Sequence, residues 1–291
     1  SAAIAGVRRY IGKYAALSAY KPYGISFGDS HEGSVPFRYV PVGPADKNSI
    51  LMHLDKSTIN GAEADITFDT GAGVNIISDS LALKYGLVPL DAFESVGGMG
   101  VQSGRYAIAK ELKLGNITVT DVPFVVLTLT TNNKEADQYI DCFGIVVGSE
   151  LMLQLKDLTV DFVNRRISVP SDIPSRSDAR PNMCFSSSMN LLARGMIHDN
   201  PMLVNIDTGD ASYGILDKTF LDRNKEFVMS HSPADSVRMA GIGGVHISQC
   251  YRVPDMTARL GGSTVTIPVM DVRMQDNPAG MKGRMKRALT L

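Results

Sequence analysis

The tripeptide Asp-Thr-Gly occurs twice in the sequence, each time at the end of an apolar run. Asp69-Thr70-Gly71 follows residues 64–68, and Asp207-Thr208-Gly209 follows residues 202–206. A β-strand that carries a carboxylate into a glycine turn supplies half of a two-carboxylate site. Two carboxyl groups about 3 Å apart cannot both be ionised, so the pair shares one proton. One member can then act as a base and the other as an acid towards a single water. One chain holds both halves of such a site, which predicts a monomer.

One triplet alone is a weak signal, because Asp and Gly are common turn residues after a strand. The sequences that follow the two triplets strengthen it, since they correspond in order, spacing and residue type. Each has a glycine-rich stretch, then a tyrosine, a Leu-Gly turn, a proline and an apolar strand. These features lie at 96–101, Tyr106, 114–120 and Pro123 in the first half, and at 240–245, Tyr251, 260–266 and Pro268 in the second. The correspondence predicts an internal duplication.

Short alternating runs, broken by Gly, Pro and Asn from Val35 onward, predict a mostly β protein. Helical spacing of apolar residues predicts a helix within 7–20, which the sequence Pro22-Tyr23-Gly24 ends. A short helix is expected over 79–85 with Gly86 at its C-terminal cap, and a matching element over 215–221.

Four segments are expected on this basis. They are an N-terminal helical extension (1–34), a first lobe (35–170), a proline-containing linker (171–194) and a second lobe (195–291). Fewer residues follow Pro268 than follow Pro123, and residues 281–287 have no strand pattern. The second lobe is therefore predicted to be incomplete at its C-terminus.

Length and composition fit a soluble two-domain protein. The chain has 291 residues, 44% hydrophobic and 20% charged. A net charge of -1 gives no reason to expect nucleic acid as a partner, and no apolar run is long enough for a transmembrane segment. The start at Ser1 indicates a mature N-terminus, with any export signal already removed. Cys142, Cys184 and Cys250 are compatible with one disulfide and a free thiol, or with three buried thiols.

The chain resembles the aspartic peptidases, the group that includes retropepsins and pepsins. Three elements carry the resemblance: residues 68–72 with the apolar run at 76–78, the glycine-rich stretch 97–100, and 145–148 followed by 158–169. The second half matches in its triplet and glycine-rich stretch but lacks a hydrophobic-hydrophobic-Gly element. Ala72 after the first triplet is retropepsin-like, whereas duplication in one chain is pepsin-like. Bacterial members combine such traits, which implies a bacterial, exported protein.

The resemblance implies a mostly β, bilobed aspartic-peptidase fold, with closed, twisted β-sheet lobes and short helices. It implies an endopeptidase that hydrolyses an extended peptide or protein substrate without a metal or cofactor. Asp69 and Asp207 would activate the water, supported in their loops by Thr70, Gly71, Thr208 and Gly209. Two hairpin flaps would close over the substrate. Their predicted substrate-binding residues are Gly98, Met99, Gly100, Gly243 and Gly244.

Asp210, directly after the second triplet, departs from the family's usual Ala, Ser or Thr. If its side chain faces the dyad, a third carboxylate raises the apparent pKa values of the pair. A pH optimum above that of an Asp210→Ser variant is then expected. A solvated carboxylate that points away is the alternative.

Three other interpretations remain open at this stage: a non-catalytic peptide-binding protein on the same fold, an inactive clipped or precursor form, and an interaction module with widely separated carboxylates. The glycine-rich stretches lack the spacing of phosphate loops. His246 and Cys250 are only two potential ligands, which does not make a zinc site.

Overall fold

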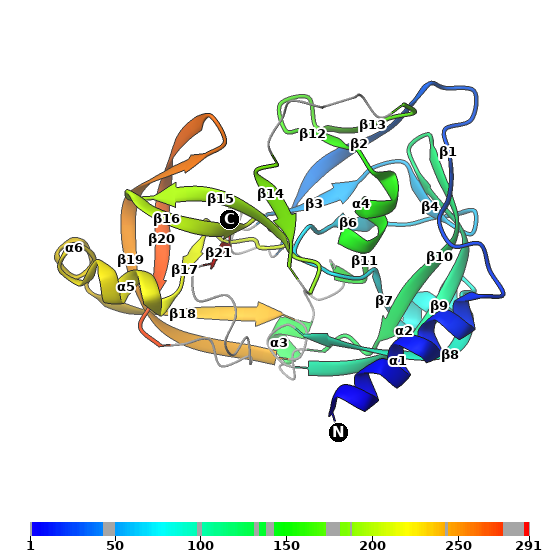
Figure 1. Cartoon of the computed structure of the whole chain (residues 1–291), viewed down its shortest axis with the longest axis horizontal. Coiled ribbons are helices and arrows are strands. Elements are labelled where there is room, and N and C mark those ends of the chain that lie inside the picture. The colour runs from blue at the N-terminus through cyan, green and yellow to red at the C-terminus, as the bar shows by residue number, and fades with distance from the viewer. Residues whose placement is uncertain are drawn as a thin grey trace.

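The structure is a computed structural model that describes residues 2–42, 50–97, 101–130, 134–137, 143–172, 181–186, 188–241, 244–275 and 288–290. Strands dominate these residues and form two sheets, one in each of two lobes (Figure 1). The mostly β prediction is confirmed.

The first sheet has 13 strands, in the order β12-β13-β2-β3-β6-β11-β7-β10-β9-β4-β5, with β1 paired to β10 and β8 to β9. Its strands are β1 (Gly24–Ser26), β2 (Glu32–Pro41), β3 (Ile50–Leu54), β4 (Ser57–Ile59), β5 (Ala62–Glu63), β6 (Ile66–Phe68), β7 (Ile76–Ser78), β8 (Val88–Gly97), β9 (Val101–Leu114), β10 (Ile117–Leu127), β11 (Ile145–Val147), β12 (Thr159–Asp161) and β13 (Arg166–Pro170). Three helices pack on this lobe or beside it: α2 (Asp79–Lys84), α3 (Lys134–Asp137) and α4 (Ser149–Leu155).

The second sheet has eight strands, in the order β14-β15-β16-β21-β17-β20-β19-β18. Its strands are β14 (Met183–Phe185), β15 (Leu191–Ile197), β16 (Asn200–Asn205), β17 (Ile215–Leu216), β18 (Ala234–Gly241), β19 (Gly244–Leu260), β20 (Ser263–Arg273) and β21 (Ala288–Thr290). Helices α5 (Lys218–Arg223) and α6 (Lys225–His231) accompany it. Strands β14 and β15 begin this sheet within the segment expected to be a linker.

Both lobes flank the strand before the triplet in the same way. In the first lobe, β11 pairs in parallel with β6 and antiparallel with β7. In the second lobe, β21 pairs in parallel with β16 and antiparallel with β17. The second half has no hydrophobic-hydrophobic-Gly sequence, as expected, but the strand Ala288–Thr290 occupies the place that residues 145–147 hold in the first lobe. A three-residue strand next to a run of basic residues is too short to show an alternating pattern, which is why the sequence did not reveal it.

Each lobe also contributes a long hairpin, β8–β9 in the first and β18–β19 in the second. The last pairs before the two turns are Gly97 with Val101 and Gly241 with Gly244. Both hairpins extend along the lower edge of the molecule in Figure 1, from opposite lobes towards the middle. They are the elements that the sequence predicted as flaps.

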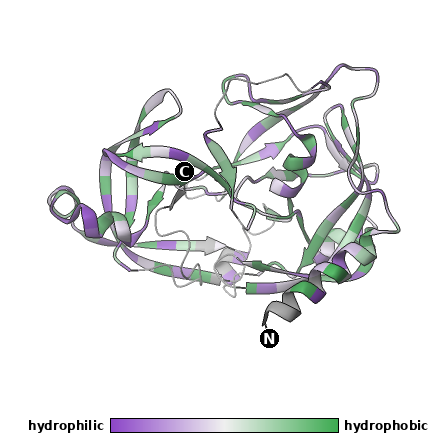
Figure 2. Cartoon of the chain, in the orientation of Figure 1, coloured by the Kyte–Doolittle hydropathy of each residue, from purple (hydrophilic) through white to green (hydrophobic). Residues whose placement is uncertain are grey.

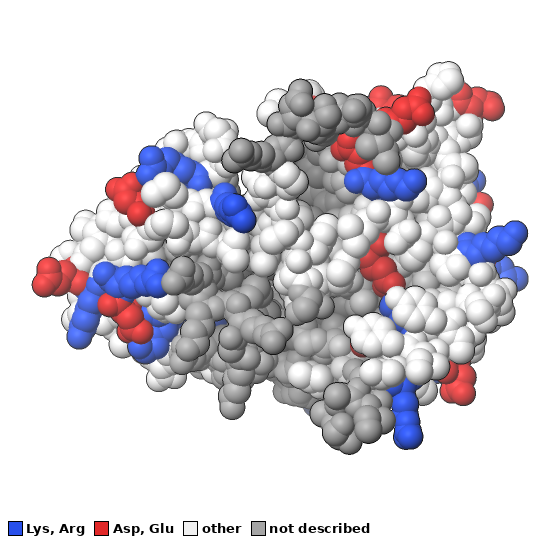
Figure 3. All heavy atoms as spheres, viewed as in Figure 1, with Lys and Arg blue, Asp and Glu red and all other residues white. Residues whose placement is uncertain are grey.

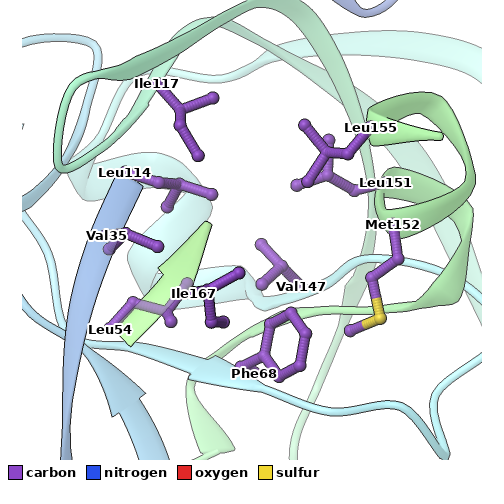
Figure 4. A pocket seen from close by; sticks show the side chains of 10 residues that line it. All are labelled: Val35, Leu54, Phe68, Leu114, Ile117, Val147, Leu151, Met152, Leu155 and Ile167. Carbon is purple, nitrogen blue, oxygen red and sulfur yellow. The ribbon is translucent and has the colours of Figure 1, made fainter. Parts of the chain in front are cut away.

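Apolar residues of the strands form separate cores in the two lobes (Figure 2). The first core contains a cavity of about 10 Å³ lined by ten apolar side chains, among them Phe68, Val147 and Leu151 (Figure 4). This volume is at the lower limit for one water molecule, and an apolar lining offers that water no partner. The cavity is a packing defect beside β6, the strand that precedes Asp69, and has no room for a ligand.

The N-terminal helix α1 (Ala2–Leu17) packs against β8. Leu17 lies in an apolar cluster with Val96 of β8 and Leu127 of β10. Lys13 forms an ion pair with Glu150 of α4 at 3.1 Å, with side chains only 12% and 20% exposed. The helix is thus joined to the first lobe by both apolar and charged contacts. It ends before β1 and β2, so the segment expected as a helical extension also contains strands of the first sheet.

The short helices begin at side-chain caps. Ser78 Oγ accepts from Leu81 N at the start of α2, and Asp217 Oδ1 accepts from Phe220 N at the start of α5. Gly86 follows α2 with φ +62°, as its predicted cap position requires. In the second lobe, Ile215 and Leu216 form β17, so the helix starts later than the expected element at 215–221.

Basic and acidic side chains are interspersed on the face shown in Figure 3. Among the described residues, no helix is both long and apolar enough to cross a membrane. Cys184 is exposed and Cys250 is buried, both as free thiols, whereas Cys142 lies outside the described residues.

Candidate active site

Each Asp-Thr-Gly triplet begins where a central strand of its lobe ends. Asp69 follows β6 directly, and its backbone N–H donates to the carbonyl of Val147 in β11 at 3.0 Å. Asp207 follows β16 after Ile206. Because both strands have neighbours on either side, the carboxylates are carried on the most constrained part of each sheet.

Four hydrogen bonds made by Thr70 and Thr208 connect the two lobes. Thr70 Oγ1 donates to the carbonyl of Ile206 at 2.5 Å, and Thr208 Oγ1 donates to the carbonyl of Phe68 at 2.7 Å. Each threonine hydroxyl also accepts from the backbone N–H of the other threonine, at 3.1 and 3.0 Å. The network is symmetric, so both loops have the same orientation towards the interface between the lobes.

The glycines of the triplets face the opposite carboxylates. A Cβ on Gly71 would collide with the carboxylate of Asp207, and a Cβ on Gly209 would collide with that of Asp69. No residue with a side chain fits at either position without displacing a carboxylate. The structure therefore brings the two predicted catalytic aspartates into one site, each against the other's loop.

Hydrogen bonding to the two carboxylates is unequal. Asp69 Oδ1 accepts from the backbone N–H of Gly71 at 2.7 Å and of Ala72 at 3.1 Å. Asp207 Oδ1 accepts from the N–H of Gly209 at 3.0 Å, and its Oδ2 lies 3.5 Å from Asn205 Nδ2. Backbone N–H donors favour the ionised form of a carboxyl group. Asp69 is therefore the better stabilised anion of the pair.

Burial raises the pKa values of both carboxyl groups. At Asp69 the hydrogen bond from Gly71 opposes this shift most strongly. At Asp207, burial together with the charge of Asp69 and then of Asp210 raises the pKa to about 8. The pair therefore retains one shared proton well above the pH at which an isolated aspartic acid ionises.

The charge of Asp210 contributes to raising the pKa of both Asp69 and Asp207. Asp210 Oδ1 accepts from Ser212 N at 2.9 Å, which fixes the side chain in the loop after the triplet. The role of Asp210 as a modulator of the dyad remains a prediction.

Three polar residues support the loops and were not predicted from the sequence. Ser149 Oγ donates to the carbonyl of Thr70 at 3.1 Å, and Asn190 Nδ2 donates to the carbonyl of Gly71 at 2.7 Å. Asn75 Oδ1 accepts from the N–H of Gly148 at 3.0 Å. Asn75 and Ser149 are fully buried, and Asn190 is 8% exposed. The signal in the sequence would have been a polar residue within a segment expected to be buried.

The predicted flap residues are only partly within the described structure. Gly98, Met99, Gly100 and Gly243 lie outside the described residues, whereas Gly244 begins β19. The strands that lead into both turns are described, and Tyr106 on β9 donates from its hydroxyl to Glu94 of β8 at 3.1 Å. The hairpin geometry is therefore known up to its ends.

A metal site does not appear among the described residues, where no group of three or more His, Cys, Asp or Glu side chains comes together. The reaction that paired carboxylates can catalyse does not require a metal ion. It is the polarisation of one water by a base and an acid on either side of it.

Comparisons with known proteins agree with this geometry in the first lobe. Residues 56–143 match a family model described as aspartyl protease, a range that includes the first triplet and the β8–β9 hairpin. No curated protein matches the chain in sequence. Among solved structures, Basic 7S globulin from soybean aligns at 10% identity and a TM-score of 0.47, over 90% of this chain and 89% of that one.

The fold class predicted from the sequence, a mostly β, bilobed aspartic-peptidase fold, is confirmed by the two lobes with paired triplets and by this family match. The part of the chain that is similar to the aspartyl protease model, residues 56–143, lies within the first lobe.

Proposed function

We propose that the chain is an aspartic endopeptidase that hydrolyses a peptide bond with Asp69 and Asp207. The observation that carries this proposal is the placement of each carboxylate against the glycine of the other triplet. Such closeness couples the ionisation of the two groups, which is how aspartic proteases, the best-known example, keep one proton between two carboxyls.

The unequal hydrogen bonding assigns the roles. Asp69, with two backbone N–H donors, is the ionised base and takes a proton from the water. The water oxygen bonds to the carbonyl carbon while the proton of Asp207 moves to the carbonyl oxygen, giving a tetrahedral diol. The proton on Asp69 then passes to the amide nitrogen, the C–N bond breaks, and Asp207 recovers a proton from one hydroxyl. Both carboxyls return to their initial states.

The two long hairpins provide the substrate-binding surface in this proposal. An extended peptide can add to exposed strand edges by backbone hydrogen bonds, with side chains alternating between pockets. Closure of both hairpins over the peptide would exclude bulk water from the reaction. The predicted monomeric state is supported by the presence of both halves of the site in one chain.

Cleavage of an unfolded protein tests the proposal. Casein is incubated between pH 3 and 8 with the parent chain and with the Asp69→Asn and Asp207→Asn variants. Asp29→Asn serves as the matched control, because Asp29 is exposed and distant in sequence from both triplets. We expect a bell-shaped pH profile for the parent and control, and loss of cleavage in both dyad variants.

Two results would contradict the proposal. Cleavage that survives both substitutions would place the activity elsewhere. A correctly folded parent that leaves casein and a peptide library intact at every pH would show that the paired triplets do not act as a peptidase.

A further inference from the structure

Arg273, the last residue of β20, has a half-buried guanidinium without a counter-ion. Its Nε is buried and makes no hydrogen bond, and its Nη2 lies 3.4 Å from the sulfur of Met239. Within the described residues, no carboxylate oxygen lies within ion-pair distance of it. Arg252 on the adjacent strand β19 differs, since it pairs with Asp271 at 3.2 Å. A buried cation costs free energy unless a carboxylate or another acceptor compensates it.

The contacts of Arg273 place it between the second hairpin and the second catalytic loop. Met239 belongs to β18, the first strand of that hairpin. Burial lowers the pKa of Arg273, and the charges of Asp210, Asp217 and Asp271 oppose this shift. The guanidinium therefore lies against the second hairpin, and the residue after the second triplet is among the acidic residues that act on it.

Strand register identifies the corresponding residue in the first lobe. Leu127 of β10 pairs with Ser78, which caps α2. In the second lobe, Val272 pairs with Leu216, so Arg273 comes opposite Asp217, which caps α5. By the same correspondence, Asp210 takes the position of Ala72 after the triplet.

Leu127 and Arg273 occupy corresponding positions, but the first has apolar surroundings and the second has charged surroundings. Leu127 is 2% exposed and packs with Val96 of the first hairpin and with Ala72. Its apolar surroundings are covered by α1 through Leu17. In the second lobe the same place holds a cation and a carboxylate, and the carboxylate of Asp210 already accepts from Ser212. Asp271, which also acts on Arg273 by its charge, is paired with Arg252. The Nε of Arg273 therefore remains able to donate to a further acceptor.

We propose that Arg273 binds an acidic substrate side chain, Glu or Asp, in the subsite of the second lobe next to the scissile bond. The inference rests on the proposed function, because it concerns the peptide that lies across the same site. A carboxylate can pair with the planar guanidinium through two parallel hydrogen bonds, which specifies both charge and geometry. Such pairing compensates the burial of Arg273 only when the correct substrate is present.

Peptide binding tests the inference separately from catalysis. Fluorescent octapeptides that differ only in Glu, Gln or Leu at each position in turn are titrated into the uncleaving Asp69→Asn chain and followed by anisotropy. We expect one position at which Glu binds at least tenfold more tightly than Gln. Adding Arg273→Leu should remove that preference and favour Leu there, whereas Arg273→Lys should retain part of it.

Arg259→Leu is the matched control, because it removes an arginine of β19 whose partner, Asp199, is exposed and is not among the charges that act on Arg273. It should leave the preference for Glu unchanged. Thermal melting of every variant checks that the chain remains folded.

Absence of any preference for Glu over Gln, or a preference that survives Arg273→Leu, would overturn the inference. Cleavage is measured in parallel with the parent chain. Selective binding without cleavage would refute the peptidase proposal while supporting the acidic subsite. Cleavage by the parent chain that Arg273→Leu leaves unchanged would support the peptidase proposal and refute the acidic subsite.

Discussion

Thr70 and Thr208 each bond to the strand that carries the other's aspartate. Thr70 Oγ1 donates to the carbonyl of Ile206, and Thr208 Oγ1 donates to the carbonyl of Phe68. Because every bond in this network crosses between the lobes, the distance between the carboxylates is set by the two hydroxyls rather than by either lobe alone.

Removal of the Thr70 hydroxyl should loosen this lock. In Thr70→Ala, the N–H of Thr208 and the carbonyl of Ile206 lose their partner, which costs about 1–3 kcal/mol for each buried group that stays unsatisfied. A misplacement of the carboxylates by about 1 Å should lower kcat roughly 100-fold. Thr70→Ser keeps the hydroxyl and should retain most activity. Full activity and an unchanged melting temperature in Thr70→Ala would contradict the role of this bond.

The close approach of Gly71 to Asp207 predicts a loss of function from a single methyl group. Gly71→Ala should force the Asp207 carboxylate out of position and reduce kcat/KM by a factor on the order of 100. Gly262→Ala is the control, since a Cβ there meets nothing within 4 Å and the residue lies in the exposed turn between β19 and β20. Steady-state kinetics on both variants provides the measurement, and equal kinetics for the two would argue against the geometry of the dyad.

The charge of Asp210 should set the alkaline limit of activity. A neighbouring anion raises the pKa of a carboxyl, and burial with Asp69 and Asp210 brings the pKa of Asp207 to about 8. In Asp210→Ser the shared proton should therefore be lost at lower pH, so the alkaline limb of the kcat/KM profile moves towards acid. The pH dependence of kcat/KM is compared with that of Asp29→Ser, which should match the parent. Superimposable profiles for Asp210→Ser and the parent would exclude the influence of Asp210.

The ion pair between Lys13 and Glu150 should matter for stability far more than the surface pairs. Its side chains are 12% and 20% exposed, and Lys13 also lies 4.8 Å from the centre of the Tyr106 ring. Lys13→Met leaves Glu150 as a buried charge without its partner, which typically costs about 3–5 kcal/mol of the free energy of unfolding. Lys218→Met, which breaks the exposed pair with Asp222, should cost less than about 1 kcal/mol. Urea denaturation measures both.

A smaller loss in Lys13→Met than in Lys218→Met would contradict this ranking. If the N-terminal helix detaches instead, Lys13→Met should increase the accessibility of β8 to hydrogen exchange, because α1 packs on that strand.

The sequence predicted those parts of the site in which the chemistry restricts the residue type. Asp69 and Asp207 could be identified because a strand, a carboxylate and a glycine recur in order. The hairpins could be identified because glycine-rich turns separate alternating runs. The predicted roles of Thr70 and Thr208 as loop supports remain predictions, although the structure gives each a bond across the lobes.

Other features depend on contacts that no short pattern encodes. Asn190 reaches the carbonyl of Gly71 from a segment expected to be a linker, and nothing in its neighbourhood marks it. Arg273 is notable only when strand register places it opposite a helix cap, in the position that Leu127 occupies in the first lobe. Register follows from tertiary packing, so a single sequence did not reveal either residue.

The location of β21 has a consequence for how the site forms as the chain is made. The strand before Asp207 is flanked in parallel by residues 288–290, which are synthesised long after β16 has emerged. The first lobe is closed in the same way, because Val146 of β11 pairs with Thr67 of β6 from a similar distance along the sequence. Because β21 is made last, we expect the second lobe to complete its sheet after the first, since contacts between remote segments form slowly. A nascent chain that has not yet produced residues 288–290 would lack one of the two strands that flank β16, so Asp207 would not yet be fixed opposite Asp69.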